Sequence, residues 1–454
     1  MKKIFKSPQT ATILTLAMPI FVELFLGSLF GMVDMIMLGR YGSHSLSTSA
    51  IAVVGFTNQI MFIGLSLVTS LCTGATAIIA RYLGMRREKQ VSSVLSHIII
   101  LNLALVAIPF VVISIVFAEK ILTALGAEAN TISLGIIYYY VILIGFVFQA
   151  FNFSVFSAMR GSSDTKTPMK INLIVNIANV LGNAALIYGL GPFPELGVLG
   201  AGISTALSHV VATAISLLII LNPKYIIHLN LKKKFVFNKS IIQNLVKIGG
   251  PAALEQMAFR VGILRFVHIV ASLGTTVYAT HQICLNIIGL SFSTGQAFST
   301  ATSTLVGRSL GEQKPDLAAN YMKRTRNIGM IAGLILGVIM FTFGGNIVGL
   351  YNKNPDVIAS GATIMMIVAV IQPIQNAQFI IAGGLRGAGD TVWTLISTFI
   401  SVFIIRIAMA KLFIDTFHLG LVGAWFAMLI DQFARFVFVN ARYYSGKWKY
   451  ISLK

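Results

Sequence analysis

Residues 98–118 read IIILNLALVAIPFVVISIVFA, and stretches of this kind decide the fold of the chain. The segment carries no charged residue. It is long enough to cross a hydrocarbon core of about 30 Å as a helix. Similar blocks recur along the 454 residues, of which 56% are hydrophobic and 11% are charged. Soluble domains carry about a quarter charged residues, and the strands of a membrane barrel would alternate apolar and polar residues. The sequence therefore predicts an all-α membrane protein.

Hydropathy, interrupted at glycine, proline and charged residues, predicts twelve transmembrane helices. Their ranges are 11–39, 49–82, 91–118, 128–159, 166–190, 196–222, 241–272, 276–306, 318–346, 358–384, 390–416 and 419–445. Basic residues gather in the loops after the second, fourth, sixth and eighth helices and are scarce in the odd-numbered loops. By the positive-inside rule, the basic loops and both termini are expected in the cytoplasm. We therefore expect a multi-pass protein of the cytoplasmic (plasma) membrane. Its net charge of +20 then reflects topology and not a nucleic-acid partner.

The second half of the chain repeats the first. The segment MRGSSDT at 159–165 matches LRGAGDT at 385–391, and the Pro-x-x-x-Glu pattern that begins at Pro19 recurs at Pro251. Matches in the same order at nearly one offset predict two homologous six-helix lobes, with a cavity at their interface. The predicted domains are an N-lobe at 1–222, a cytoplasmic inter-lobe linker at 223–240 and a C-lobe at 241–454. The lysines of the linker could instead bind anionic lipid.

The two R-G-x-x-D-T segments have a local explanation as turns between helices. Gly161 and Gly387 are expected to close the preceding helices as C-caps, where an arginine suits the negative helix end. Asp164 and Asp390 are expected to cap the N-termini of the following helices. We interpret both segments as structural turns and not as transport sites.

Asp34 is the clearest functional candidate within the spans. An ionisable group at the centre of a membrane helix costs about 2.5–3.5 kcal/mol on insertion scales, so each one is a functional hypothesis. No cation lies within four residues of Asp34 in the sequence. A carboxyl group buried without a cationic partner can load and release a proton, or bind Na⁺ where oxygen atoms surround it. The alternative is a carboxyl group that only hydrogen-bonds two helices together.

Four asparagines follow one face of the predicted span 166–190. Their spacing of four, three and four residues places them on one side of a helix. A polar stripe on an apolar span is expected to turn toward a wet cavity or another helix. Such residues either join helices, at roughly 1 kcal/mol each or less, or contact a cation or substrate. They are Asn172, Asn176, Asn179 and Asn183.

Further acidic residues lie on the first and seventh spans. Glu23 lies eleven residues before Asp34, so both side chains face nearly the same direction. Glu255 is its mate in the repeat, and such a pair could attract cationic substrates. The alternative for Glu255 is a pair with Arg260 or another buried cation. The predicted substrate-binding residues are Glu23, Asn176 and Glu255.

The last span holds an acidic and a basic residue four positions apart. Asp431 and Arg435 are expected to pair with each other on one helix face. His281 and Arg406 receive no role beyond packing.

These motifs, together with LVGRSLG at 305–311 and ATHQI at 279–283, resemble the multidrug and toxin extrusion (MATE) transporters. The likeness covers essentially the whole chain. It implies a V-shaped pair of six-helix lobes that exports mostly cationic, amphipathic drugs by alternating access. The export would be an antiport with H⁺ or Na⁺, and no other cofactor is implied.

The resemblance also implies a cation-coupling site in the N-lobe. Asp34, Asn179, Asn183 and Thr205 match that site, with Asp34 and Asn179 as metal ligands only if the coupling ion is Na⁺. The position of Asn183 is Asp in several sodium-binding members of the family. This chain therefore has one formal charge fewer at the site, which favours H⁺.

Three other classes of function compete with drug export. A lipid or polysaccharide-precursor flippase of the same superfamily would need basic residues in the spans to hold phosphate, and Arg260 and Arg265 keep this alternative open. An enzyme would need a metal-ligand cluster, a phosphate-binding loop or a Ser/His/Asp group, and the sequence offers none. A channel fits a two-lobe repeat less well than a rocking carrier does. We therefore expect a monomer in the lipid bilayer that is not an enzyme.

Overall fold

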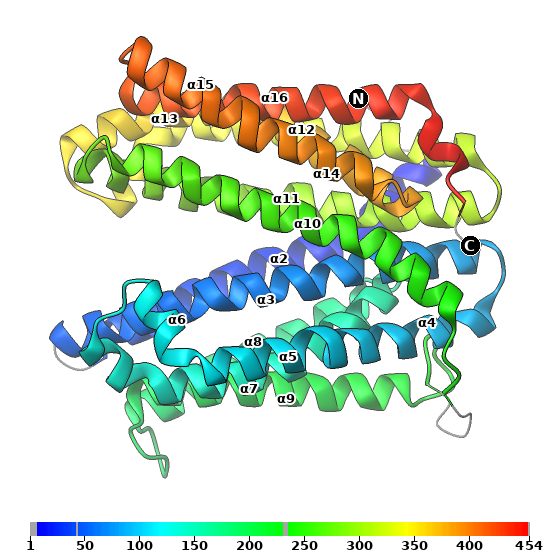
Figure 1. Ribbon diagram of the computed structural model, residues 1–454, viewed down its shortest axis with the longest axis horizontal. Coiled ribbons are helices and arrows are strands. Elements are labelled where there is room, and N and C mark those ends of the chain that lie inside the picture. The colour runs from blue at the N-terminus through cyan, green and yellow to red at the C-terminus, as the bar shows by residue number, and fades with distance from the viewer. Residues whose placement is uncertain (1–6, 42–43, 230–234, 453–454) are drawn as a thin grey trace. The chain divides into compact units, whose positions relative to one another are not determined.

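The computed structural model describes residues 7–41, 44–229 and 235–452, and no strand occurs within them. Figure 1 shows the described chain as a set of long helices joined by short turns. The helices of the first half are α2 (Pro8–Gly39), α3 (His44–Gly84), α4 (Glu88–Leu101), η1 (Asn102–Ala107), α5 (Ile108–Val116), α6 (Ala118–Ala124), α7 (Ala129–Gly161), α8 (Lys166–Tyr188) and α9 (Gly197–Ile220). Those of the second half are α10 (Lys239–Ala271), α11 (Thr275–Gly311), α12 (Pro315–Tyr351), α13 (Pro355–Ala388), α14 (Thr391–Phe399), η2 (Ile400–Arg406), α15 (Ile407–Lys411), η3 (Leu412–Thr416), α16 (Gly420–Ser445) and η4 (Lys447–Tyr450).

Every predicted span coincides with a long helix or with a run of helices joined end to end. Within the described part of the chain, 10 of these segments are long and apolar enough to cross a membrane. The helices α10 and α11 are long enough to cross a membrane but are more polar than these 10 segments. The reason is that α10 carries charged side chains and α11 carries many hydroxyl groups. The prediction of an all-α membrane protein is confirmed.

The described chain divides into two compact units. The N-unit contains residues 22–82 and 86–245, and the C-unit contains the residues up to Phe21, 83–85 and those from Val246 onward. The predicted assignment of 1–222, 223–240 and 241–454 to an N-lobe, a linker and a C-lobe stays a prediction.

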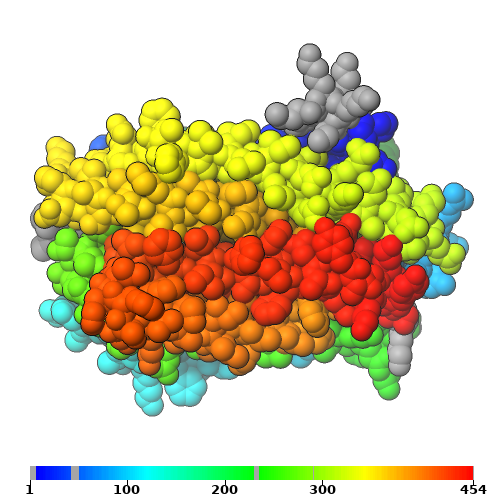
Figure 2. Space-filling view, turned by 90° about the horizontal axis from the view of Figure 1, so that it is seen from above, coloured from blue at the N-terminus to red at the C-terminus, as the bar shows by residue number. Residues whose placement is uncertain are grey.

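Each unit has its own apolar core. In the N-unit, α9 packs against α7 and α8, and the core includes the fully buried Tyr139 and Leu143 of α7. In the C-unit, α13 packs against α11, α12 and α16, and Trp425 of α16 is fully buried. Figure 2 shows the red surface of α16 beside the orange α14–η3 segment, with which it is in contact. In hydrocarbon, the backbone groups of a helix form their hydrogen bonds within that helix. The contacts between helices are therefore made mainly by side chains.

The two R-G-x-x-D-T turns have the same backbone conformation, and it differs from the prediction. The left-handed residues are Ser163, with φ 71°, and Gly389, with φ 90°. These positions lie two residues after Gly161 and Gly387, so the prediction that those glycines are the C-caps is wrong. In both turns the N–H group of the next residue, an aspartate, donates to a carbonyl group five residues earlier, which closes the helix end.

Gly161 and Gly387 instead allow neighbouring helices to approach closely. A Cβ atom added to Gly161 would lie 2.8 Å from the carbonyl oxygen of Thr76, and one added to Gly387 would collide with the carbonyl oxygen of Ser303. Both obstacles are backbone atoms and cannot rotate away. The repeated glycine is therefore required by helix packing and not by the turn.

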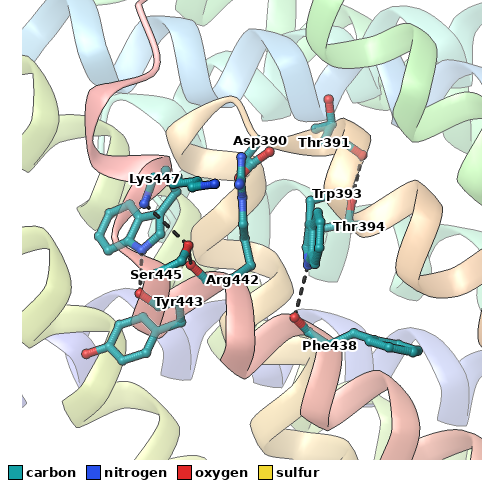
Figure 3. A network of polar contacts seen from close by, with 10 residues as sticks. Asp390, Thr391, Trp393, Thr394, Phe438, Arg442, Tyr443, Ser445 and Lys447 are labelled. Carbon is teal, nitrogen blue, oxygen red and sulfur yellow. Dashed lines mark hydrogen bonds and ion pairs between the residues drawn. The ribbon is translucent and has the colours of Figure 1, made fainter.

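The two aspartates of these turns have different partners. Asp164 Oδ1 accepts a hydrogen bond from the N–H group of Thr167 at 3.0 Å, so its predicted N-cap role is confirmed. Asp390 makes no such bond to the start of α14. Its Oδ2 accepts from Nε of Arg442 on α16 at 2.6 Å (Figure 3). The cap predicted for Asp390 is wrong, because an arginine from another helix binds the carboxylate.

We predict that Gly387→Ala destabilises the protein. The new methyl group has no room beside Ser303, and overpacking of this kind costs about 1–3 kcal/mol. Gly349→Ala in α12 is the control, since its methyl group would lie at 3.7 Å from Ile358 Cδ1, and alanine is the better helix former. Melting of the detergent-solubilised variants should show a lower midpoint for Gly387→Ala only. Equal midpoints would contradict the packing argument.

Candidate functional site

Asp34 lies on α2 among amide groups of α8. Asn183 Nδ2 donates to Asp34 Oδ1 at 2.7 Å. The side-chain amide of Asn179 forms hydrogen bonds with all its polar neighbours in one orientation. In this orientation its Nδ2 donates to both oxygens of Asp34, at 3.1 Å each, and its Oδ1 accepts from Thr205 Oγ1 at 3.1 Å. The structure therefore brings together Asp34, Asn179, Asn183 and Thr205, the four residues predicted to form a cation-coupling site.

Asp34 has hydrogen-bond donors but no charged partner. Among the residues that the structure describes, no Lys, Arg or His forms an ion pair with it. Amide groups stabilise a carboxylate without neutralising it. Such a carboxylate can be neutralised by a proton or by a bound cation.

The oxygen atoms around Asp34 also determine whether the site has ligands for a sodium ion. The buried Oδ1 of Asn183 has no hydrogen-bond partner, so it is available as an oxygen ligand beside the carboxylate of Asp34. Asn179 would have to turn its amide to offer an oxygen beside Asp34, since its oxygen faces Thr205. No group of three or more His, Cys, Asp or Glu side chains gathers in the described ranges, so a transition-metal site has no support there.

A cavity of about 240 Å³ opens beside this cluster within the N-unit. Asp34, Asn183 and Thr205 contribute to its wall, and much of the rest of the lining is apolar or aromatic. The apolar part includes Met35, Met61, Phe62 and Phe146. The cavity therefore combines one acidic group with flexible methionine and planar phenylalanine side chains, which adapt to ligands of different shapes.

Sequence reasoning missed three polar residues of the same cavity. Asn58 of α3, Gln149 of α7 and His209 of α9 all line it. None of them belongs to a run of regularly spaced amides like the four asparagines of α8. No stripe therefore marks them, and the only signal was the cost of placing a polar side chain in a membrane span.

Glu23 lies apart from the cavity and is neutralised by an arginine. Its Oε1 accepts from Nη2 of Arg160 and from Nδ2 of Asn172, both at 2.5 Å. The side chain is buried, and it is not among the residues that line the cavity. Asn176, which lies on the same face of α8 as Asn172, does not line the cavity either.

Glu255 occupies the equivalent place in the C-unit. Its Oε1 accepts from Nη2 of Arg386 at 2.5 Å and from Thr398 Oγ1 at 3.1 Å, and its Oε2 accepts from Thr394 Oγ1 at 2.8 Å. The alternative that Glu255 pairs with a buried cation is therefore confirmed, and the cation is Arg386 instead of Arg260. The arginines of the two R-G-x-x-D-T segments thus have a function that the sequence did not reveal, since each neutralises the repeated glutamate.

The buried carboxylate of Asp431 is held by two arginines. Arg435 Nη2 donates to Asp431 Oδ2 at 2.9 Å, as predicted, and Arg406 Nη2 donates to the same oxygen at 2.5 Å. All three side chains are at most 4% exposed. Arg406 is thus an ion-pair partner as well as a packing residue, whereas the fully buried His281 packs its ring edge-on against Trp425.

We predict that Asp431→Asn strongly destabilises the C-unit. The substitution leaves two buried guanidinium groups without a counter-charge, and breaking a buried ion pair costs about 3–5 kcal/mol. Asp316→Asn is the matched control, because Asp316 pairs with Lys449 while its own side chain is 95% exposed, and surface pairs contribute little. The melting midpoint in detergent should fall for Asp431→Asn alone. A wild-type midpoint for Asp431→Asn would refute the argument.

Comparisons with known proteins agree with this architecture. The sequence model of the MatE family matches residues 19–185 and 251–412. A probable multidrug resistance protein NorM of Thermotoga maritima is 31% identical, over 96% of this chain and 92% of its own. The uncharacterized transporter YisQ of Bacillus subtilis is 28% identical, over 97% and 95%. A solved multidrug resistance MATE family transporter of the MOP superfamily, in an outward-facing conformation, gives a TM-score of 0.89 at 21% identity and covers 98% of both chains. Since the matched stretches make up most of the sequence, the chain belongs to the MATE family of transporters.

Proposed function

We propose that this protein is a secondary active multidrug exporter that exchanges cationic, amphipathic compounds for H⁺ or Na⁺. The observation that carries the proposal is Asp34, a carboxylate whose hydrogen-bond partners in the described part of the chain are amide groups and which lines a cavity with apolar and aromatic walls. The names of the relatives support the substrate class, since NorM is a probable multidrug resistance protein. No cofactor and no enzymatic reaction form part of the proposal.

Competition for one negative charge provides the coupling. With the cavity open toward the cytoplasm, a cationic drug would bind near Asp34. With the cavity open outward, H⁺ or Na⁺ would neutralise Asp34 and displace the drug. The lobes would then move back so that the cavity again opens toward the cytoplasm. Each ligand then weakens the binding of the other by the same factor. One charge moved through 100 mV supplies about 2.3 kcal/mol to drive this cycle.

We favour H⁺ over Na⁺ as the coupling ion. The second oxygen-bearing residue at the site is Asn183, which is neutral, and the affinity of an oxygen site for a metal ion rises with the number of charged ligands. A proton needs only the carboxylate. The roles of Glu23, Asn176 and Glu255 in substrate binding stay proposals, and the two ion-paired glutamates would act only if their arginines moved away.

The lipid or polysaccharide-precursor flippase is the second candidate, and the cavity does not favour it. A flippase must hold phosphate groups, for which proteins use Arg and Lys. No Arg or Lys lines the described N-unit cavity, which contains Asp34 and the neutral amides instead. We further propose that the protein is a monomer in the cytoplasmic membrane with both termini in the cytoplasm, as the positive-inside rule indicates.

We predict that Asp34→Asn abolishes ion-driven export. Asparagine keeps the size of the side chain but can carry neither charge nor coupling proton. Ethidium export from vesicles under an imposed proton gradient should fall about tenfold or more. Asp356→Asn, at the exposed start of α13, is the control and should export at the wild-type rate. Wild-type export by Asp34→Asn would disprove the proposed coupling site.

We predict that Asn183→Asp raises the response to sodium. A second carboxylate beside Asp34 adds a charged oxygen ligand, and the Na⁺ concentration for half-maximal export should fall roughly tenfold. Export would be measured with Na⁺ and H⁺ gradients imposed separately. Asn176→Asp adds the same charge on the same face of α8 away from Asp34, and it should not raise the sodium response. An equal gain in sodium response in both variants would show that the cation does not bind beside Asp34.

A further inference from the structure

The N-unit cavity contains two polar side chains that do not join helices. Gln149 of α7 and His209 of α9 both line the cavity beside Asp34, and both are half-buried. Among the residues that the structure describes, neither side chain forms a hydrogen bond or an ion pair. His209 accepts bonds from Asn152 and Thr213 only through its backbone oxygen. A polar side chain in a membrane span is costly, so each one is a candidate for function.

A neighbouring asparagine of α7 shows what a helix-joining residue looks like in this unit. Asn152 is only 3% exposed. Its Nδ2 donates to the backbone oxygen of His209 at 3.1 Å, and its Oδ1 accepts from Ser216 Oγ at 3.3 Å. These bonds hold α7 against α9. Gln149, three residues earlier, makes no such bond and lines the cavity instead, so the joining of helices does not account for it.

Gln149 and His209 lie at the same level of the cavity wall. A Cβ atom added to Gly145 of α7 would lie 3.0 Å from Cα of Ala206 in α9, so the two helices touch at this point. The bonds of Asn152 lie further along both helices, and α7 and α9 therefore run in the same direction. Gln149 follows Gly145 by four residues and His209 follows Ala206 by three, so both lie about one turn beyond the contact.

This pair is separated from the acidic group by about one helical turn. Thr205 belongs to the cluster around Asp34, because its hydroxyl group lies 3.1 Å from the side-chain amide of Asn179. His209 follows Thr205 by four residues, a rise of about 6 Å along α9. The amide of Gln149 offers donors and an acceptor, and the imidazole offers two ring nitrogens. The cavity thus combines a negative charge with further hydrogen-bonding groups one turn away.

We propose that Gln149 and His209 form a hydrogen-bonding subsite of the cavity, which selects cations that carry an amino, hydroxyl or amide group about one helical turn from their charge. Cations with only hydrocarbon and aromatic groups would bind less tightly. This inference rests on the proposed function, since it takes Asp34 as the partner of the positive charge, and it adds a substrate class to that function.

Desolvation explains the preference. A ligand that fills the cavity removes water from the amide of Gln149 and the imidazole of His209. A ligand with hydrogen-bonding groups replaces that water, whereas an apolar ligand leaves both side chains without partners, which weakens its binding. Apolar pockets with a few polar groups commonly obtain their specificity in this way.

Two phenanthridinium cations test the subsite because they differ only in their hydrogen-bonding groups. Ethidium carries amino groups on its ring system, and its deaminated analogue has the same cationic skeleton without them. The dissociation constants of both compounds would be measured with the full-length protein in detergent, by equilibrium dialysis at a single pH. The selectivity ratio is the constant of the deaminated analogue divided by that of ethidium.

Removal of either polar group should lower this ratio. Gln149→Leu keeps the approximate size of the side chain without a hydrogen-bonding atom, so the ratio should fall about five- to tenfold, the value of one hydrogen bond. His209→Leu should act in the same direction, whereas His209→Gln keeps a donor and an acceptor and should retain the ratio. The deaminated analogue should bind Gln149→Leu at least as tightly as the wild type, which shows that the variant is folded.

Two controls separate the subsite from the charge. Gln90→Leu is the same substitution at an exposed position of α4 and should keep the wild-type ratio. Asp34→Asn should weaken both compounds by the same factor and therefore also keep the ratio. An unchanged ratio in Gln149→Leu would overturn the subsite and leave the exporter proposal intact. Wild-type affinity of Asp34→Asn for both compounds would instead contradict the role of Asp34 in the proposed function, and with it the position assigned to the ligand.

Discussion

The absence of water in the hydrocarbon core is the constraint on which the rest of this structure depends. Backbone groups must bond within their own helix, and a charged side chain must find a counter-charge inside the protein. Buried carboxylates of the described chain follow this rule. Arg160 neutralises Glu23, Arg386 neutralises Glu255, and two arginines hold Asp431. The pairs of Glu23 and Glu255 join helices that are far apart in the sequence, whereas the pairs of Asp431 lie within α16 and between α16 and the preceding η2.

Asp34 departs from the rule, and this departure gives the N-unit its chemistry. Its hydrogen-bond partners are amides, which stabilise the charge without cancelling it. Among the residues that the structure describes, no lysine or arginine lines the cavity beside it. In the function proposed above, a proton, a metal ion or a cationic drug supplies the missing counter-charge. A group whose neutralisation is left to mobile ligands is suited to couple the movement of one ligand to that of another.

The repeat placed the same glutamate–arginine pair in both units, but the surroundings of the two pairs have diverged. Thr394 and Thr398 satisfy Glu255 together with its arginine, so both of its oxygens have partners. The position that corresponds to Thr394 is Pro168, which has no hydroxyl group, and Oε2 of Glu23 has no hydrogen-bond partner. The pair in the C-unit is thus the more complete one. This difference is consistent with a structural task for the C-unit pair.

The sequence by itself determined the fold class and the spans, and its resemblance to the MATE transporters indicated the group around Asp34. Hydrocarbon demands long apolar helices, and a helical period of 3.6 residues fixes which asparagines of α8 share a face with Asn183. Tertiary structure alone decided that Arg160 binds Glu23, 137 residues away, and that Arg442 replaces the predicted cap at Asp390. It also decided that Asn58 enters the cavity. Periodicity reports only on neighbours within one helix, whereas these partners meet because separate helices pack together, and no local pattern encodes which helices do so.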